Sequence, residues 1–169
     1  MKNLTILAAL GLAAVSSAQS NFLEEPTNVA FRLGYVYPID SGMRDVASSY
    51  IGVGADFFTG IRLLKNAETT ISIDWFGKSG SGAKGNAFPV MINQRIYNGD
   101  ATVGGRSYFF FGAGVVFADI TNADTVLGAR VGYGRELGEN LFAEGIFTYS
   151  EAAKGSRVTS LGFYLGYRF

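Results

Sequence analysis

The sequence of 169 residues has 14 basic and 14 acidic side chains and contains neither cysteine nor histidine. Balanced charge without a basic run argues against a nucleic-acid partner, and the absence of cysteine excludes disulfides, thiolate zinc sites and thiol catalysis. The absence of histidine removes the usual general base and the commonest metal ligand, so we expect no enzyme activity, no metal and no cofactor.

The first residues have the pattern of a secretory signal. Lys2 supplies a positive start, residues 4–15 are apolar, and the small residues 16–18 form a cleavage site. The apolar stretch is too short to cross a bilayer as a helix, and an N-terminal amphipathic or core helix is the alternative. We expect residues 1–18 to be a signal peptide that exports the protein, and residues 19–27 to be a polar periplasmic lead-in.

The rest of the chain alternates strand-like runs with turn-rich connections. The runs are rich in Val, Ile, Phe and Tyr and follow a period of two, which is typical of half-buried strands. Eight runs cover residues 28–37, 49–64, 69–77, 87–97, 105–118, 125–137, 140–150 and 158–169. The connections carry Gly, Asn and Asp in turn combinations, and no useful helical periodicity is present after residue 20. The pattern predicts one all-β domain over residues 28–169.

One face of each run is apolar and the other is rich in glycine. In the last run, Phe163, Leu165 and Tyr167 alternate with Gly162 and Gly166. Every lysine beyond residue 20 lies in a connection, so the polar face consists of glycine with a few Arg, Asp and Tyr residues.

Two kinds of barrel share this alternation. A soluble barrel puts its apolar face inside and normally fills the outer face with larger polar residues, because glycine weakens a strand. A membrane barrel turns the apolar face to lipid and lines a narrow lumen, where glycine leaves room for large residues. The glycine-rich polar face favours a closed, eight-stranded, antiparallel up-and-down transmembrane barrel. A soluble periplasmic barrel that binds an apolar ligand remains the alternative.

The aromatic residues support the membrane interpretation. If the first strand starts on the periplasmic side, aromatic side chains gather at both rims, as an interfacial barrel requires. The outer-rim aromatics are Tyr35, Tyr37, Trp75, Phe117 and Tyr149, and the inner-rim ones are Phe109, Tyr133, Tyr167 and Phe169. The same topology predicts that the longer, external loops are residues 38–48, 77–85, 119–124 and 151–157.

Charged residues on the polar face should lie in the lumen. The predicted lumen charges are Arg32, Asp56, Asp74, Arg95, Arg130, Glu144 and Arg168. Unpaired charges in so narrow a space would cost several kcal/mol each, so we expect them to pair across strands. The main interpretation is a salt-bridged plug that closes the barrel, and a narrow polar conduit or gate is the alternative. A catalytic carboxylate pair is disfavoured because the set contains enough arginine to neutralise it.

Two segments resemble a known family. Residues 28–169 resemble the small eight-stranded barrels of the bacterial outer membrane, the OmpA, OmpX and OmpW-like group, and the hairpin Arg130–Tyr149 and the terminal strand 161–169, together with the signal peptide, carry the resemblance. In that family a C-terminal aromatic residue, preceded by alternating apolar residues, is recognised by the barrel-assembly machinery. The residues that match this assembly signal are Phe163, Leu165, Tyr167 and Phe169.

The resemblance implies a monomer in the outer membrane of a diderm bacterium, in contact with lipid and lipopolysaccharide. We expect a non-enzymatic barrel with a side-chain-filled lumen and a structural or surface-interaction role. A narrow channel for small or apolar solutes and the soluble barrel are the alternatives.

Overall fold

The computed structural model describes most of the predicted domain. The described residues are 29–61, 63–64, 67–80, 83–98, 105–120, 123–153 and 155–169. The predicted signal peptide, residues 1–18, and the predicted lead-in, residues 19–27, lie outside this part of the chain.

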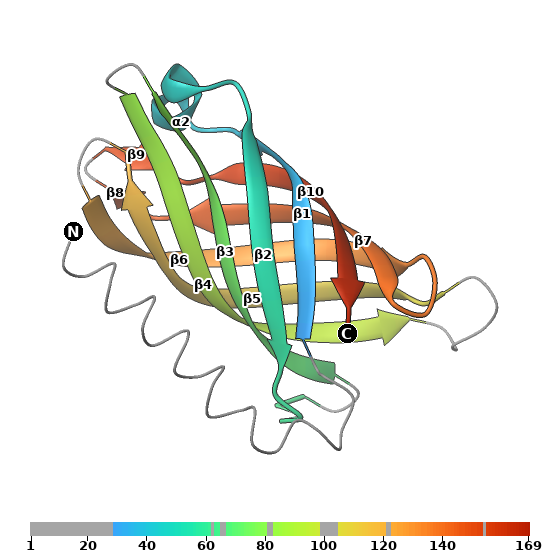
Figure 1. Ribbon diagram of the computed structural model, residues 1–169. Helices are drawn as coiled ribbons and strands as arrows, with labels where there is room; N and C mark the ends of the chain where they lie inside the picture. Colours follow the sequence, from blue (N-terminus) through green and yellow to red (C-terminus); the bar gives the residue numbers. More distant parts are fainter. Residues whose placement is uncertain are drawn as a thin grey trace, which may run out of the picture.

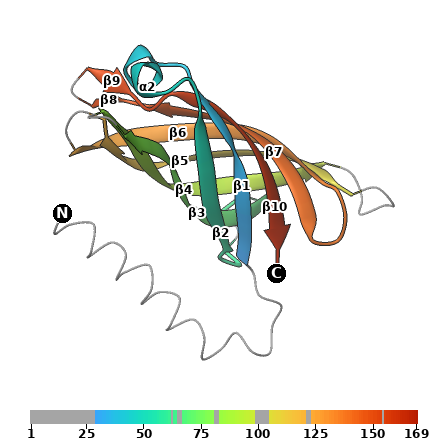
Figure 2. The same cartoon turned by 45° about the horizontal axis from the view of Figure 1, so that its top comes forward.

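Eight long strands in the described part form a closed antiparallel barrel (Figures 1 and 2). They are β1 (Val29–Pro38), β2 (Tyr50–Phe58), β3 (Ala67–Gly80), β4 (Ala83–Asn98), β5 (Ser107–Asp119), β6 (Ala123–Glu136), β7 (Leu141–Ser150) and β10 (Ser160–Arg168). Each pairs with its neighbour in the sequence, and β10 pairs with β1, from Ala30 opposite Arg168 to Pro38 opposite Ser160. The predicted fold class is therefore confirmed.

The two ends of the barrel differ. At one end, called the α2 end below, lie the short helix α2 (Ser41–Val46) and the small hairpin of β8 (Ala152–Ala153) and β9 (Ser156–Arg157) (Figure 2). At the other, the terminal end, β1 begins and β10 finishes. There the Phe169 amide donates to the Val29 carbonyl oxygen at 3.0 Å. Among the described residues, no helix is long and apolar enough to cross a membrane.

Helix α2 was not predicted, because six residues are too few to show a helical period. It begins at Asp40, whose carboxylate accepts from the Gly42 amide at 3.0 Å and so caps the first turn. Its Met43 side chain is completely buried, which anchors the helix over the barrel mouth.

Two predicted boundaries are wrong. The second strand ends at Phe58 instead of residue 64, because Gly60, with a φ of 69°, turns the chain towards β3. The predicted external loop 77–85 is mostly strand, since β3 and β4 stay paired as far as Gly80 opposite Ala83. The glycine, serine and lysine residues that suggested a loop form the end of this hairpin instead.

The fourth run, which alternates poorly, is a full strand. β4 pairs with both neighbours, but its register with β3 skips the positions between Val90 and Ala87. Pro89 lies in that gap, where its missing amide proton removes no hydrogen bond to β3.

The apolar face points outward and the polar face inward. Phe163, Val131 and Ile73 are 68%, 43% and 40% exposed, whereas Arg130 and Asp74 are buried in the interior. This is the arrangement of a membrane barrel and the reverse of what a soluble barrel with an apolar interior requires.

Candidate functional site

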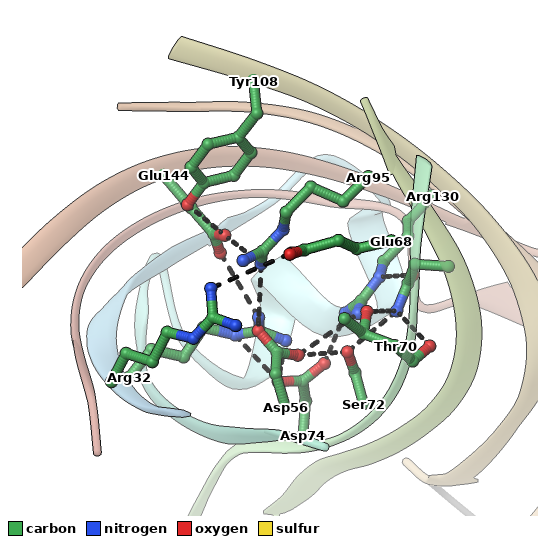
Figure 3. A network of polar contacts seen from close by, with 12 residues as sticks. Arg32, Asp56, Glu68, Thr70, Ser72, Asp74, Arg95, Tyr108, Arg130 and Glu144 are labelled. Carbon is green, nitrogen blue, oxygen red and sulfur yellow. Dashed lines mark hydrogen bonds and ion pairs between the residues drawn. The ribbon is translucent and has the colours of Figure 1, made fainter. Parts of the chain in front are cut away.

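Six charged side chains meet in the middle of the lumen, each from a different strand (Figure 3). In order from β1, β2, β3, β4, β6 and β7 they are Arg32, Asp56, Asp74, Arg95, Arg130 and Glu144. All six were predicted from the polar face, and all are at most 6% exposed. Three arginines face three carboxylates, so the cluster, called the lumen cluster below, is neutral.

Arg32 is the centre of the lumen cluster. Its guanidinium nitrogens lie 2.6 Å from Oδ2 of Asp56, 2.6 Å from Oδ1 of Asp74 and 3.3 Å from Oε2 of Glu144. One planar group therefore connects β1 to its neighbour β2 and to β3 and β7, each of which lies one strand further round the barrel. Such charge-assisted hydrogen bonds are the strong ones in proteins, and they fix the geometry of both partners.

The other two arginines complete the pairing. Arg130 Nη1 lies 2.6 Å from Oδ2 of Asp74, and Arg95 Nη2 lies 2.9 Å from Oε1 of Glu144. Arg95 Nη2 also lies 3.3 Å from Oδ2 of Asp56, so each carboxylate has at least two arginine nitrogens as partners. A general base or nucleophile needs a free lone pair, so this arrangement disfavours catalysis by Asp56 and Asp74.

Uncharged polar groups, which were not predicted, extend the lumen cluster. Asn93 accepts from Arg130 Nε at 2.6 Å and donates to Ser72 Oγ at 2.8 Å, and Ser72 donates to Asp56. Asn93 and Ser72 each lie two residues from a charged member of the cluster on the same strand, so they face inward as well. This two-residue spacing is the signal that could have identified them from the sequence.

β5 and β10, the two strands that contribute no charged residue to the lumen cluster, each contribute a tyrosine. The Tyr108 hydroxyl donates to Glu144 Oε1 at 2.8 Å, and its ring lies 4.4 Å below the guanidinium carbon of Arg95. Tyr164 lies beside Arg32, at 5.6 Å from ring to guanidinium. The aromatic faces partly solvate these cations in place of water.

Glycine provides the space that the large side chains occupy. A Cβ atom on Gly54 would overlap Oδ1 of Asp74, and one on Gly134 would overlap the Tyr108 ring. The glycine-rich polar face of the sequence is therefore a steric requirement of a filled lumen.

The α2 end of the lumen is apolar. Met43 from α2 packs there in the buried apolar core, and the Tyr50 hydroxyl donates to the Met43 carbonyl oxygen. Other buried members of this layer are Val36, Phe76, Ala118, Ile120, Ala153 and Val158. The lumen thus passes from an apolar layer beneath α2 to the charged lumen cluster.

Arg168, the seventh predicted lumen charge, does not join the lumen cluster. It lies at the terminal end, with its guanidinium carbon 3.9 Å from the centre of the Phe58 ring and Nη1 3.9 Å from Oε2 of Glu68. The prediction that Arg168 belongs with the other six charges is wrong. The alternation along a strand shows which side chains face inward, but it does not fix how far along the barrel axis a residue of a tilted strand lies.

A cavity of about 400 Å³ opens at the terminal end, and Arg95 and Arg168 both line it. Arg106, on its rim, binds Glu136 through Nε and Nη2 at 3.1 and 3.0 Å. The hydrogen bonds that Arg106 donates to the Glu136 carboxylate raise the pKa of Arg106, although partial burial opposes this. Arg106 therefore remains a charged group of the rim at any physiological pH.

The predicted assembly signal and rim aromatics lie on the outer face. Phe163, Leu165 and Tyr167 are exposed along the outside of β10, and Phe169, directly after the end of that strand, is exposed as well. Of the rim residues, Tyr35, Tyr37, Trp75, Phe117 and Tyr149 lie towards the α2 end of their strands, and Tyr133 lies towards the terminal end.

Comparisons with known proteins establish the fold. No family model and no curated protein matches the sequence. The N-terminal β-barrel domain of Pseudomonas aeruginosa OprF matches with a TM-score of 0.54 and 16% identity, over 86% of this chain and 100% of that chain. Neisserial surface protein A matches with a TM-score of 0.51 and 10% identity, over 86% and 100%. The chain therefore has the fold of these small outer-membrane barrels.

Proposed function

We propose that this protein is a non-enzymatic barrel of the bacterial outer membrane whose lumen is closed by its own side chains. Its role would be structural, or that of a surface on which other molecules dock at the α2 end. Two features support the membrane location. The outer face is apolar, as contact with lipid requires. The sheet is also closed, and in lipid only a closed barrel satisfies every backbone polar group of a sheet.

The proposal includes the biogenesis predicted from the sequence. Residues 1–18 would direct export, and the barrel-assembly machinery would recognise the exposed alternation that ends at Phe169. The mature protein would be a monomer among lipid and lipopolysaccharide. The likeness in fold to two small outer-membrane barrels supports this location.

One observation carries the closed-lumen proposal: the lumen cluster joins six of the strands with ion pairs and is neutral. Arg32 alone contacts carboxylates on three other strands. An ion moving through would have to separate these buried pairs, and each broken pair leaves an uncompensated charge.

Single-channel recording in planar bilayers tests this proposal. The refolded protein should insert without steady currents, while a general porin refolded in the same way gives them. Steady currents from the unmodified protein would contradict the closed lumen. Folding is verified separately by the heat-dependent gel migration that closed barrels show, so that a failure to fold is not mistaken for a closed lumen when no current is seen.

A narrow conduit is the second candidate, and the cavity at the terminal end favours it. That cavity reaches Arg95, a member of the lumen cluster, so it extends from the mouth into the lumen as far as this arginine. If the protein conducts, Arg95→Ala should increase the current, whereas Arg44→Ala on the exposed surface of α2 should not change it.

A further inference from the structure

The inward face of the barrel changes character towards the α2 end. Val36 follows Arg32 on the inward face of β1, and Phe76 follows Asp74 on that of β3, and both apolar side chains are at most 2% exposed. Above the lumen cluster, the described inward positions thus form the apolar layer beneath α2. This part of the lumen can receive an apolar group and disfavours a charged one.

Met43 is the group that α2 places in the apolar layer. Its side chain is completely buried, whereas the other five residues of α2 are half-buried or exposed. The Tyr50 hydroxyl donates to the Met43 carbonyl oxygen. The barrel therefore already holds a flexible, unbranched apolar chain with a hydrogen-bond acceptor beside it, and this occupant shows which chemistry the position accepts.

Few other contacts hold α2 over the mouth (Figure 2). The helix has six residues, too few to be stable in isolation. Among the described residues, no ion pair joins Arg44 or Asp45 of α2 to the barrel. Its approach to β9 brings together small groups, Gly42 and Ser156. Withdrawal of Met43 is therefore the main step in lifting α2, and it leaves the lumen cluster paired.

We infer that α2 is a lid and that the position of Met43 is a binding site for an unbranched apolar chain with a hydrogen-bond acceptor at one end, such as a fatty acid. In the open form Met43 leaves the apolar layer, the ligand chain replaces it, and Tyr50 donates to the ligand. Minor conformations of this kind are populated at about 0.1–10%, and a ligand that binds only the open form increases its share. The inference goes beyond the proposed function and needs the barrel but not a closed lumen, so the conductance result does not decide it.

Cysteine alkylation tests the lid, and the absence of cysteine from the chain makes the reaction specific. Val36→Cys places one thiol in the apolar layer, where iodoacetamide reaches it from the α2 end only when α2 lifts. Met43→Ala should raise the alkylation rate about ten- to hundredfold, the factor expected when the burial of a methionine is lost. Met91→Ala is the matched control, because this buried methionine lies opposite Ser72 at the level of the lumen cluster, and it should leave the rate nearly unchanged.

Decanoic acid is the probe for the site beneath the lid. In the Val36→Cys and Met43→Ala background, decanoic acid at twice its dissociation constant should lower the alkylation rate about threefold. Butyric acid, which has the same carboxylate on a short chain, should not. Tyr50→Phe should weaken the protection, whereas Tyr37→Phe on the exposed outer face should not. Glu139→Cys, in an exposed turn at the terminal end, should react equally fast with and without decanoic acid.

Heat-dependent gel migration first shows that each variant forms a closed barrel. If Met43→Ala does not fold, Met43→Gln replaces it, since glutamine keeps the length of the chain but makes it polar. An unchanged alkylation rate in the Met43 variant would overturn the lid, and so would an equal acceleration by Met91→Ala, which would mean that the whole barrel loosens. Decanoic acid that slows the reaction at Glu139→Cys as much as at Val36→Cys acts through the membrane, and this result would overturn the site.

Discussion

Arg95 on β4 and Glu144 on β7 meet across the lumen, with Nη2 of the arginine 2.9 Å from Oε1 of the glutamate. The two strands are not neighbours, because β5 and β6 stand between them in the barrel. Glu144 also accepts from Tyr108 at 2.8 Å and pairs with Arg32 at 3.3 Å. One carboxylate thus connects β7 to β1, β4 and β5 and fixes the cross-section of the barrel.

Glu144→Ala should therefore be strongly destabilising. Removing one partner of a buried ion pair costs about 3–5 kcal/mol, since the remaining charge stays buried without compensation. Equilibrium unfolding in urea from lipid vesicles measures the free energy of unfolding. Glu139→Ala, in an exposed turn, should change it by less than about 0.5 kcal/mol. Equal effects of the two substitutions would show that the lumen cluster contributes nothing to stability.

A methyl group on the inner face should be less tolerated than one on the outer face. Gly54→Ala places a Cβ atom against the Asp74 carboxylate and should cost about 1–3 kcal/mol by overpacking. Gly145→Ala, an outward-facing glycine in β7, places its Cβ 3.8 Å from the Phe163 ring, which is ordinary contact. It should be neutral or slightly stabilising. The same unfolding measurement compares the two, and a larger loss at Gly145 would contradict the assignment of faces.

An arginine on the outer face should impair insertion. Leu165→Arg and Val131→Arg place a charge on exposed apolar positions of β10 and β6, and near the bilayer midplane each should cost about 2–4 kcal/mol. Leu137→Arg, in the turn after β6, is the control and should have little effect because the arginine reaches water. Folding efficiency into lipid vesicles, read from gel migration, is the measurement. Normal folding of both strand variants would mean that lipid does not contact this face.

The barrel could be predicted from the sequence because its two faces differ so sharply in composition. Alternation identified the strands, and the concentration of glycine beside arginine and aspartate on one face identified the lumen. Six of the seven predicted lumen charges meet in the structure for this reason. These inferences needed only local period and side-chain size, which a single sequence contains.

The remaining features depend on relationships between strands. Arg168 faces inward like the lumen cluster, but it is the last residue of β10 and lies opposite Ala30 at the start of β1, so it is at the mouth instead. The tip of the β3–β4 hairpin is strand because its backbone groups pair with one another, although its composition is that of a loop. Helix α2 is held in place by the burial of Met43 over the mouth, and the local sequence pattern does not predict this contact.

Quenching of fluorescent labels tests the orientation of the faces most directly. A label is attached through Phe163→Cys, Leu165→Cys or Val131→Cys, one at a time, and the protein is refolded into vesicles that contain brominated lipid. We expect strong quenching by the brominated lipid and little by aqueous iodide at all three sites, with the reverse at Glu139→Cys. Quenching of the three strand labels by iodide, with no effect of brominated lipid, would contradict it.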